Sequence, residues 1–414
     1  MQKNGQQTQN ALIMKNIFHS IGAWFSDFTH VFCNEWKVIG HDMGALLFFV
    51  ALPLLYPITY TLIYNTEVVE QVPVAIVDNS RSPMSRKLVR DASAAPAIKV
   101  AGYAADLNEA RQWMNEGDVY AIIRIPSDYE SKISTGQQAT IEFYADMSLL
   151  LRYRALLAAM TDLQIKQTGD ITLERVNITG LESSGMTKMP IESQNAFLGD
   201  PEQGFASFVM PGIVILILQQ SMLLGISLIG GTSRERRMRN GGIDPKMIDG
   251  ASASASVWGK ALCYVILYLP LTIYVTTCIP EMFRLPHYGS ATQYLPFLLP
   301  MLFATAFLGQ ALLPIMKERE SAFLIIVFTS VIFLFTSGLT WPRYAMNQFW
   351  TWFGDLVPCT WGVEGFIRIN SNAGTLAEQM VPYKAMWILT GVYFLGAWWS
   401  LKWIRVKSML KARA

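Results

Sequence analysis

The sequence MGALLFFVALPLLYPITYTLIYNT, residues Met43–Thr66, contains no charged residue. A helix needs about 20 mostly apolar residues to cross the roughly 30 Å hydrocarbon core of a bilayer, because each residue rises 1.5 Å. This stretch therefore predicts a transmembrane helix, and five later stretches meet the same requirement. The six expected spans are Gly44–Tyr64, Ala206–Ile229, Val257–Ile279, Tyr294–Met316, Ser321–Thr340 and Ala385–Leu401.

The composition agrees with a membrane protein. Hydrophobic residues make up 52% of the chain and charged residues only 15%, which leaves too little polar surface to solvate a globule around six apolar helices. We therefore predict an α-helical polytopic membrane protein with an inserted extracytoplasmic domain. The expected parts are an N-terminal segment (1–42), a first helix (43–66), the insert with its stalk (67–205), helices two to six (206–404) and a basic tail (405–414).

The distribution of basic residues predicts the orientation of the chain. Short loops rich in Lys and Arg stay on the cytoplasmic side. Such residues follow the second span, separate the fourth from the fifth, and follow the sixth. Both termini are therefore expected in the cytoplasm and the insert outside, with the first apolar stretch acting as an uncleaved anchor. The residues concerned are Arg234, Arg236, Arg237, Arg239, Lys246, Lys317, Arg319, Lys402, Arg405, Lys407, Lys411 and Arg413.

The segment before the first span has the pattern of an amphipathic helix. From Ile17 to Ile39, apolar and aromatic residues recur every three or four positions, while Ser20, Asp27, Asn34 and Lys37 lie opposite them. An aromatic face and a polar face predict a helix that lies along the membrane interface. A metal site is not expected, because structural zinc sites use four well-spaced ligands and this segment offers only His30, Cys33 and His41.

Two cysteines are expected near the outer face. Cys278 and Cys359 could form a disulfide, but two separate thiols are the favoured interpretation, because a free cysteine commonly serves as a small buried hydrophobe.

The insert alternates strand and helix signals. Helix starts are expected at Ser82, Asp106 and Ser127, and this alternation favours a compact α/β or α+β domain. An apolar-rich helix, Leu149–Ile165, is expected next, and Gly169–Gly204 is expected to form a helical stalk and a loose return to the membrane. The predicted strands are Val72–Val77, Ile98–Tyr103, Val119–Ile125 and Thr140–Tyr144.

Catalytic motifs are missing from the sequence. It contains no G-x-x-x-x-G-K-[ST] phosphate loop, no H-E-x-x-H and no G-x-S-x-G. No charged residue is expected deep within a span, which argues against a proton relay. We therefore expect a chain that is not an enzyme, binds no cofactor or metal itself, does not bind nucleic acid, and depends on a partner for energy.

Several local motifs resemble one family. The layout and these motifs are similar to the permease subunit of a type 2 ATP-binding-cassette transporter with a large extracytoplasmic domain between its first two spans. The loop Arg237–Gly242 departs from that family, since it lacks the acidic residue and the Gly-Thr pair often found there. The matching segments are Pro73–Ser80 with Ser85–Arg86, Gly117–Ala121 with Ile125–Pro126, Arg234–Arg236, and Ser337–Leu339 with Trp341–Pro342, Pro358 and Glu364–Arg368.

The resemblance implies an exporter in a bacterial inner membrane. Two permease chains, identical or paralogous, would form the path, and a separate ATPase subunit would hold ATP and Mg²⁺. A periplasmic adaptor could engage the insert. Apolar spans surrounded by membrane lipid favour a lipophilic or amphipathic cargo. The competing interpretations are a non-transporting receptor or scaffold that displays the insert, and an ion-coupled carrier.

The resemblance also points to candidate site residues. The loop 232–250 is the expected contact with the ATPase, although its arginines could serve only to fix topology. A short second loop is a further candidate, although it could simply be solvated. The first set is Arg234, Glu235, Arg236, Arg237 and Arg239, and the second is Lys317, Glu318, Arg319 and Glu320.

The apolar segment 341–381 is expected to re-enter the membrane from outside. It could form an outer gate over the substrate path or an aromatic belt at the interface. The gate candidates are Trp341, Pro342, Pro358, Trp361 and Glu364.

Overall fold

The computed structural model describes residues 2–64, 68–178, 204–248 and 250–413. The chain divides into two compact units. Residues 1–65 and 197–414 form a helical unit, and residues 66–196 form an α/β unit between them in the sequence. The insertion between early helices that the sequence predicts is therefore confirmed.

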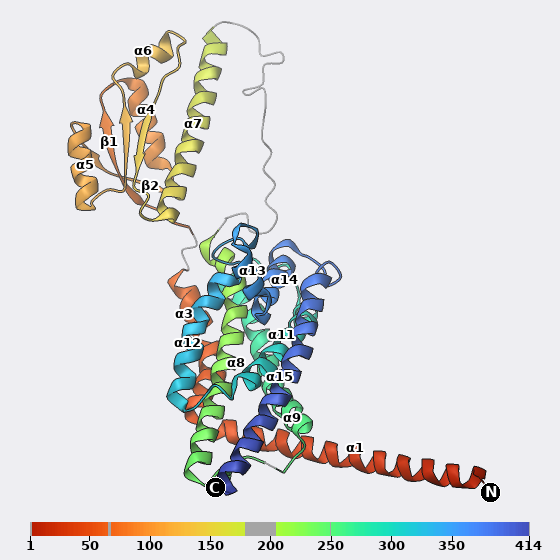
Figure 1. The fold of residues 1–414 in the computed structure, drawn as a ribbon. Coiled ribbons are helices and arrows are strands. Elements are labelled where there is room, and N and C mark those ends of the chain that lie inside the picture. The colour runs from red at the N-terminus through yellow and green to blue at the C-terminus, as the bar shows by residue number, and fades with distance from the viewer. Residues whose placement is uncertain (1, 65–67, 179–203, 249, 414) are drawn as a thin grey trace. The chain divides into compact units, whose positions relative to one another are not determined.

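The helical unit begins with a long helix and continues as a bundle (Figure 1). Its two π-helical turns continue α2 and α9 without a break. The elements are α1 (Gln2–Gly40), α2 (Met43–Leu46), η1 (Leu47–Ala51), α3 (Leu52–Ile63), α8 (Phe205–Arg239), α9 (Ala253–Ile273), η2 (Tyr274–Cys278), α10 (Ile279–Phe283), α11 (Ala291–Leu312), α12 (Arg319–Thr336), η3 (Arg343–Ala345), α13 (Gln348–Asp355), α14 (Pro358–Asn372) and α15 (Met380–Arg413).

Within the described residues, five helical segments are long and apolar enough to cross a bilayer. Each of the first five expected spans overlaps one of these segments. The sixth, Ala385–Leu401, lies inside α15, which is not one of the five. Its tryptophans and tyrosine carry polar groups, and lysines flank it, so its mean hydropathy is lower. The five segments are Met43–Ile63, Phe205–Arg239, Ala253–Phe283, Ala291–Leu312 and Arg319–Thr336.

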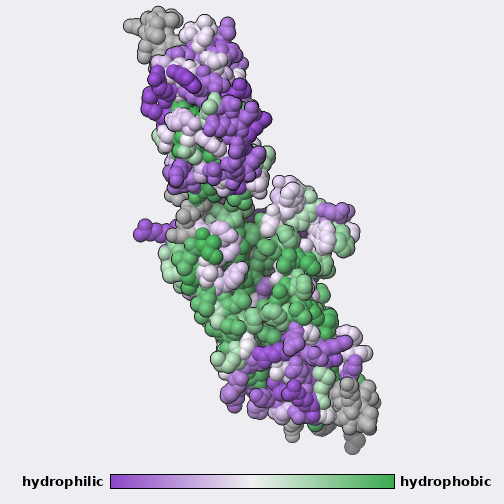
Figure 2. All heavy atoms as spheres, turned by 90° about the vertical axis from the view of Figure 1, so that its left-hand side faces the viewer, coloured by the Kyte–Doolittle hydropathy of each residue, from purple (hydrophilic) through white to green (hydrophobic). Residues whose placement is uncertain are grey.

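Burial separates the centre of the bundle from its periphery. In α8, 89% of the most apolar 18-residue stretch is buried, whereas the corresponding share is 22% in both the first span and α12. Apolar side chains of α3 and α12 stay exposed, and Figure 2 shows hydrophobic residues gathered over this face of the helical unit. Such a face suits contact with lipid tails rather than water.

The packing of α1 corrects part of the sequence prediction. The predicted helix is present, but two residues assigned to its polar face contact the bundle. The Asp27 carboxylate accepts a hydrogen bond from the Ser252 amide at 2.7 Å, and Asn34 donates to the Lys246 carbonyl at 2.9 Å. The helix packs along α9, where Gly259 allows a close approach, because a Cβ there would lie 3.0 Å from the Phe28 carbonyl oxygen. Its polar positions therefore serve tertiary contacts.

The α/β unit contains a four-stranded sheet in the order β2-β1-β3-β4. The first three strands are parallel, and β4 is antiparallel to β3. One side packs on α4, α6 and α7, and the other on α5. The elements are β1 (Val72–Asp78), α4 (Pro83–Ala94), β2 (Ile98–Tyr103), α5 (Leu107–Glu116), β3 (Ala121–Ile125), α6 (Tyr129–Ser134), β4 (Glu142–Ala145) and α7 (Leu150–Ile178).

The local signals in the insert located the starts of α4 and α5, whereas α6 begins at Tyr129, two residues after the start expected at Ser127. Ser82 caps α4 in a capping box, Asp106 caps α5, and Gly117 ends α5 with φ +86°, a left-handed conformation that glycine adopts without strain. The predicted end of the last helix at Ile165 was wrong, because α7 continues as one helix through Gly169 to Ile178, the first part of the expected helical stalk. The rest of the expected stalk, 179–203, lies outside the described residues.

Candidate functional site

The end of the bundle at which α8 ends and α9 begins carries most of the predicted coupling residues. We call it the basic end. α8 does not stop at the apolar limit Ile229 but continues to Arg239, so that the arginine run forms its last turns. Arg234 to Arg237 are partly buried, whereas Arg239 is exposed. The run is therefore part of the folded bundle rather than a free loop.

A buried carboxylate holds the chain after α8 against the helix. Arg236 binds Asp244 through two parallel contacts, Nε to Oδ1 at 2.9 Å and an Nη nitrogen to Oδ2 at 3.0 Å. The Asp244 side chain is fully buried, and the Lys246 amide also donates to it at 3.1 Å. Burial alone would raise the pKa of this carboxyl, but the hydrogen bonds from Arg236, Ser233 and Lys246 outweigh it and lower the pKa. Arg236 and Asp244 thus form an ion pair that holds the loop against α8.

The structure brings the two predicted loops together. The Glu235 carboxylate accepts a hydrogen bond from the Arg319 backbone amide at 2.8 Å, at the start of α12. Arg234 donates to the Pro314 carbonyl at 2.8 Å. Gly231 permits this approach, because a Cβ there would lie 2.8 Å from the Glu318 carbonyl oxygen. The ends of α8 and α12 therefore form one assembly.

The side chain of Arg319 extends this assembly to the first span. It contacts both carboxylate oxygens of Asp42, at 2.9 and 3.3 Å. Asp42 also caps α2, because it accepts hydrogen bonds from the Gly44 and Ala45 amides. We call the set Asp42, Glu235 and Arg319 the three-helix tie. A recess of about 330 Å³ lies beside it, lined in part by Arg236 and Lys246.

Sequence reasoning identified Glu235 and Arg319 but missed the partners Asp42 and Asp244. A signal for Asp42 was present, since an aspartate directly before an apolar helical stretch is a typical N-cap. The remaining members of the second loop, Lys317, Glu318 and Glu320, are exposed. Glu318 and Ser321 form a capping box at the start of α12.

The opposite end of the bundle contains the predicted re-entrant segment. This segment has an exposed part and a buried part. The side chains of Trp341, Phe349 and Trp352 are about 60% exposed, whereas most of α14 is buried against α8 and α11. Pro358 is the first residue of α14, and the following amide, of Cys359, donates to the buried Gln219 side chain of α8 at 2.7 Å.

A charged group joins the parts of this segment. Arg343 pairs with Asp355 and, at 2.9 Å, with Glu364. Its guanidinium lies 5.0 Å from the centre of the Trp361 ring, and the Trp361 indole donates to the Asp355 carbonyl at 3.0 Å. We call these four residues the local cluster. It includes two gate candidates, Trp361 and Glu364, while Trp341 and Pro342 are exposed.

No metal-binding group of His, Cys, Asp and Glu was found among the described residues. All four cysteines carry free thiols, with Cys278 exposed and Cys359 buried. The chain is thus a multi-pass helical membrane protein with an α/β insertion, a folded basic end, and the helices α13 and α14 at the other end.

Comparison with protein families matches residues 44–399 to the family described as ABC-2 family transporter protein. The match includes the bundle and the insert, and the chain belongs to this family. It is an ABC transporter permease, the membrane subunit, in a family without catalytic activity of its own. No individual curated protein matches the chain.

Proposed function

We propose that this chain is the permease of an ATP-driven exporter and that its basic end receives the motion of a separate ATPase subunit. ATP and Mg²⁺ would bind only to that subunit. The family assignment favours transport over the receptor or scaffold interpretation. A second permease chain, identical or paralogous, would complete the path, and α15 would act as the sixth span.

The three-helix tie is the observation that carries this proposal. Glu235 binds the start of α12, and the Arg319 side chain binds the start of α2. A partner that displaces the exposed residues Arg239 or Lys317 would therefore move three spans together. Charged rims also suit this role, because they orient and speed an encounter between subunits.

The test replaces Glu235 with alanine in the full chain, co-purified with the ATPase subunit and placed in nanodiscs. Cargo-stimulated ATPase activity should fall about tenfold, because the Arg319 amide loses its acceptor and the α8 to α12 connection loosens. Assembly with the ATPase should persist. Glu320→Ala is the matched control. Glu320 is an exposed glutamate on the first turn of α12, next to Arg319, and it is not part of the three-helix tie.

Stimulated turnover at the wild-type level in Glu235→Ala would contradict the proposal. So would an equal loss in Glu320→Ala, because the effect would then reflect the general charge of the surface and not the tie.

We also propose that the basic end faces the cytoplasm and the insert faces outward, in a bacterial inner membrane. The concentration of Arg and Lys at this end supports this orientation. The test labels intact cells with an impermeant thiol reagent after Cys33 and Cys278 are changed to serine. Tyr344→Cys should react and Lys317→Cys should react only after lysis. The opposite pattern would overturn the orientation.

We propose that the local cluster and α14 form the outer gate, and that the exposed aromatic residues of α13 anchor its rim at the interface. The insert would then offer its surface to a periplasmic adaptor. A lipophilic or amphipathic cargo suits the apolar spans. An export assay with Glu364→Gln should show slower release of the cargo at unchanged resting ATPase activity.

A further inference from the structure

A second cavity lies at the basic end, and none of the three residues of the three-helix tie lines it. It has a volume of about 70 Å³ and lies between α1, α8, α9, α11 and α15. A water molecule needs about 10–15 Å³ by this kind of measure, so the cavity has room for several waters or a compact polyatomic anion. Four cations line it, Lys260, Arg405, Arg234 and Arg237, against one carboxylate, Glu35.

Lys260 is held in place with few partners. Its Nζ lies 3.5 Å from Glu35 Oε2 and 3.5 Å from the sulfur of Met247. Only 17% of its side chain is exposed. Glu35 is fully buried and accepts a hydrogen bond from the Tyr264 hydroxyl, but its Oε2 has no hydrogen-bond donor. An ammonium group has three donors, and buried donors without short hydrogen bonds are costly.

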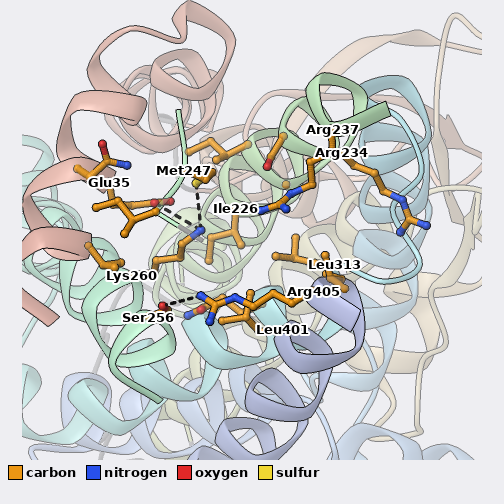
Figure 3. A pocket seen from close by; sticks show the side chains of 18 of the residues that line it. Glu35, Ile226, Arg234, Arg237, Met247, Ser256, Lys260, Leu313, Leu401 and Arg405 are labelled. Atoms are coloured by element: carbon orange, nitrogen blue, oxygen red, sulfur yellow. Dashed lines mark hydrogen bonds and ion pairs between the residues drawn. The ribbon is translucent and has the colours of Figure 1, made fainter. Parts of the chain in front are cut away.

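Arg405 approaches the same space from α15. It donates to the Ala251 carbonyl at 2.6 Å and to the Ser256 hydroxyl at 3.0 Å. Ser256 and Lys260 lie one turn apart on α9, and residues at this spacing share a helix face. The guanidinium and the ammonium are therefore held at the same face of α9. Figure 3 shows Lys260 and Arg405 both directed into the cavity, with Glu35 beyond Lys260.

Part of the remaining lining is apolar, and part is polar, with Asn34, Ser233 and Gln310 among the polar side chains. Ile226, Leu313 and Leu401 form part of the wall, and Ile226 belongs to α8, one of the five segments that are long and apolar enough to cross a bilayer. The cations stand where the apolar stretches of α8 and α9 end. Lipid phosphates lie at this depth, and basic pockets between transmembrane helices bind anionic head groups.

We propose that this cavity is a binding site for a phosphate group, held chiefly by Lys260 and Arg405. Its source is the head group of an anionic lipid or a soluble phosphate compound. The phosphate oxygens take the free donors of Lys260, and the guanidinium supplies planar charge-assisted hydrogen bonds. Glu35 positions Lys260 and offsets one of the four positive charges.

The test measures the thermal unfolding midpoint of the purified full chain in a neutral detergent. The probes are phosphatidic acid, diacylglycerol with the same acyl chains, and inorganic phosphate. Phosphatidic acid should raise the midpoint and diacylglycerol should not, since they differ only in the phosphate. Equal stabilisation by inorganic phosphate would assign a soluble occupant, and its failure to stabilise would assign a lipid.

Substitutions in the cavity test whether phosphatidic acid binds there. Arg405→Gln should weaken the apparent affinity for phosphatidic acid about tenfold, as expected for one charge-assisted contact. The double variant Glu35→Gln/Lys260→Gln should do the same, and it leaves no buried charge unpaired. Lys402→Gln is the matched control, because Lys402 is exposed on α15 and stacks on Trp398, outside the cavity.

The proposal is overturned if neither phosphatidic acid nor phosphate stabilises the wild-type chain. It is also overturned if Lys402→Gln loses as much affinity as the two cavity variants, because binding would then reflect the overall positive charge of this end.

Discussion

The two ends of the bundle use charged residues in different ways. At the basic end, Arg319 and Asp42 are 277 residues apart in the sequence, and Tyr264 and Glu35 are 229 apart. At the opposite end, Arg343 lies 12 residues from Asp355 and 21 from Glu364. The basic end is therefore connected across the bundle, whereas the local cluster folds one segment on itself. Long-range ties suit transmission of motion, and a local cluster suits a part that moves as a unit.

The largest expected effect is at the buried pair of the basic end. Glu35→Ala leaves Lys260 without a counter-charge and Tyr264 without its acceptor, and breaking a buried pair in this way costs about 3–5 kcal/mol. The unfolding midpoint measured by intrinsic fluorescence should fall accordingly. Glu364→Ala at the opposite end should cost less, because its partners remain partly solvated.

An equal cost for the two substitutions would remove the distinction between the ends. Glu35→Gln separates the charge from the hydrogen bond, because the amide retains an acceptor for the Tyr264 hydroxyl. Its loss of stability relative to wild type should therefore be smaller than that of Glu35→Ala.

A smaller effect is expected at Asp244. Its pKa is lowered in the folded chain, so its ion pair with Arg236 contributes stability above the ordinary value of 3.8 and loses it as the pH falls through the lower folded value. Asp244→Asn should cost about 1.5–3 kcal/mol at pH 7, the usual range for a hydrogen bond to a charged group. Thermal unfolding between pH 7 and pH 3 should show the gap between the two proteins closing in acid. A constant gap would mean that the ion pair is not its source.

The sequence predicted what depends on local pattern. The first five spans, the strand Ile98–Tyr103 and the caps at Ser82 and Asp106 follow from length, alternation and capping chemistry. The span expected at Ala385–Leu401 was not confirmed, because tryptophan lowers mean hydropathy while still suiting an interface.

Tertiary pairing could not be predicted from pattern. Glu35 was overlooked because a glutamate in an amphipathic helix is ordinarily solvated, and only the neighbouring α9 makes it buried. The charged loop after α8 was expected to contact the ATPase, and its sequence did not indicate that Asp244 is fully buried within it. Such pairs depend on which helices become neighbours, which a single sequence does not reveal.

The smallest effect on stability is expected for the two partly exposed pairs, and their comparison is the sharpest functional test. Double-mutant cycles of Asp42→Asn with Arg319→Gln, and of Glu364→Gln with Arg343→Gln, should each give a coupling energy of about 0.5–1 kcal/mol. Similar energies make the two pairs fair controls for each other. In nanodiscs with the ATPase subunit, Asp42→Asn should reduce cargo-stimulated ATP hydrolysis, because the first span is released from the tie. Glu364→Gln should instead slow cargo export while hydrolysis continues. If both variants impair hydrolysis equally, the long-range tie is not what carries motion from the basic end, since a pair that joins only neighbouring residues would then serve as well.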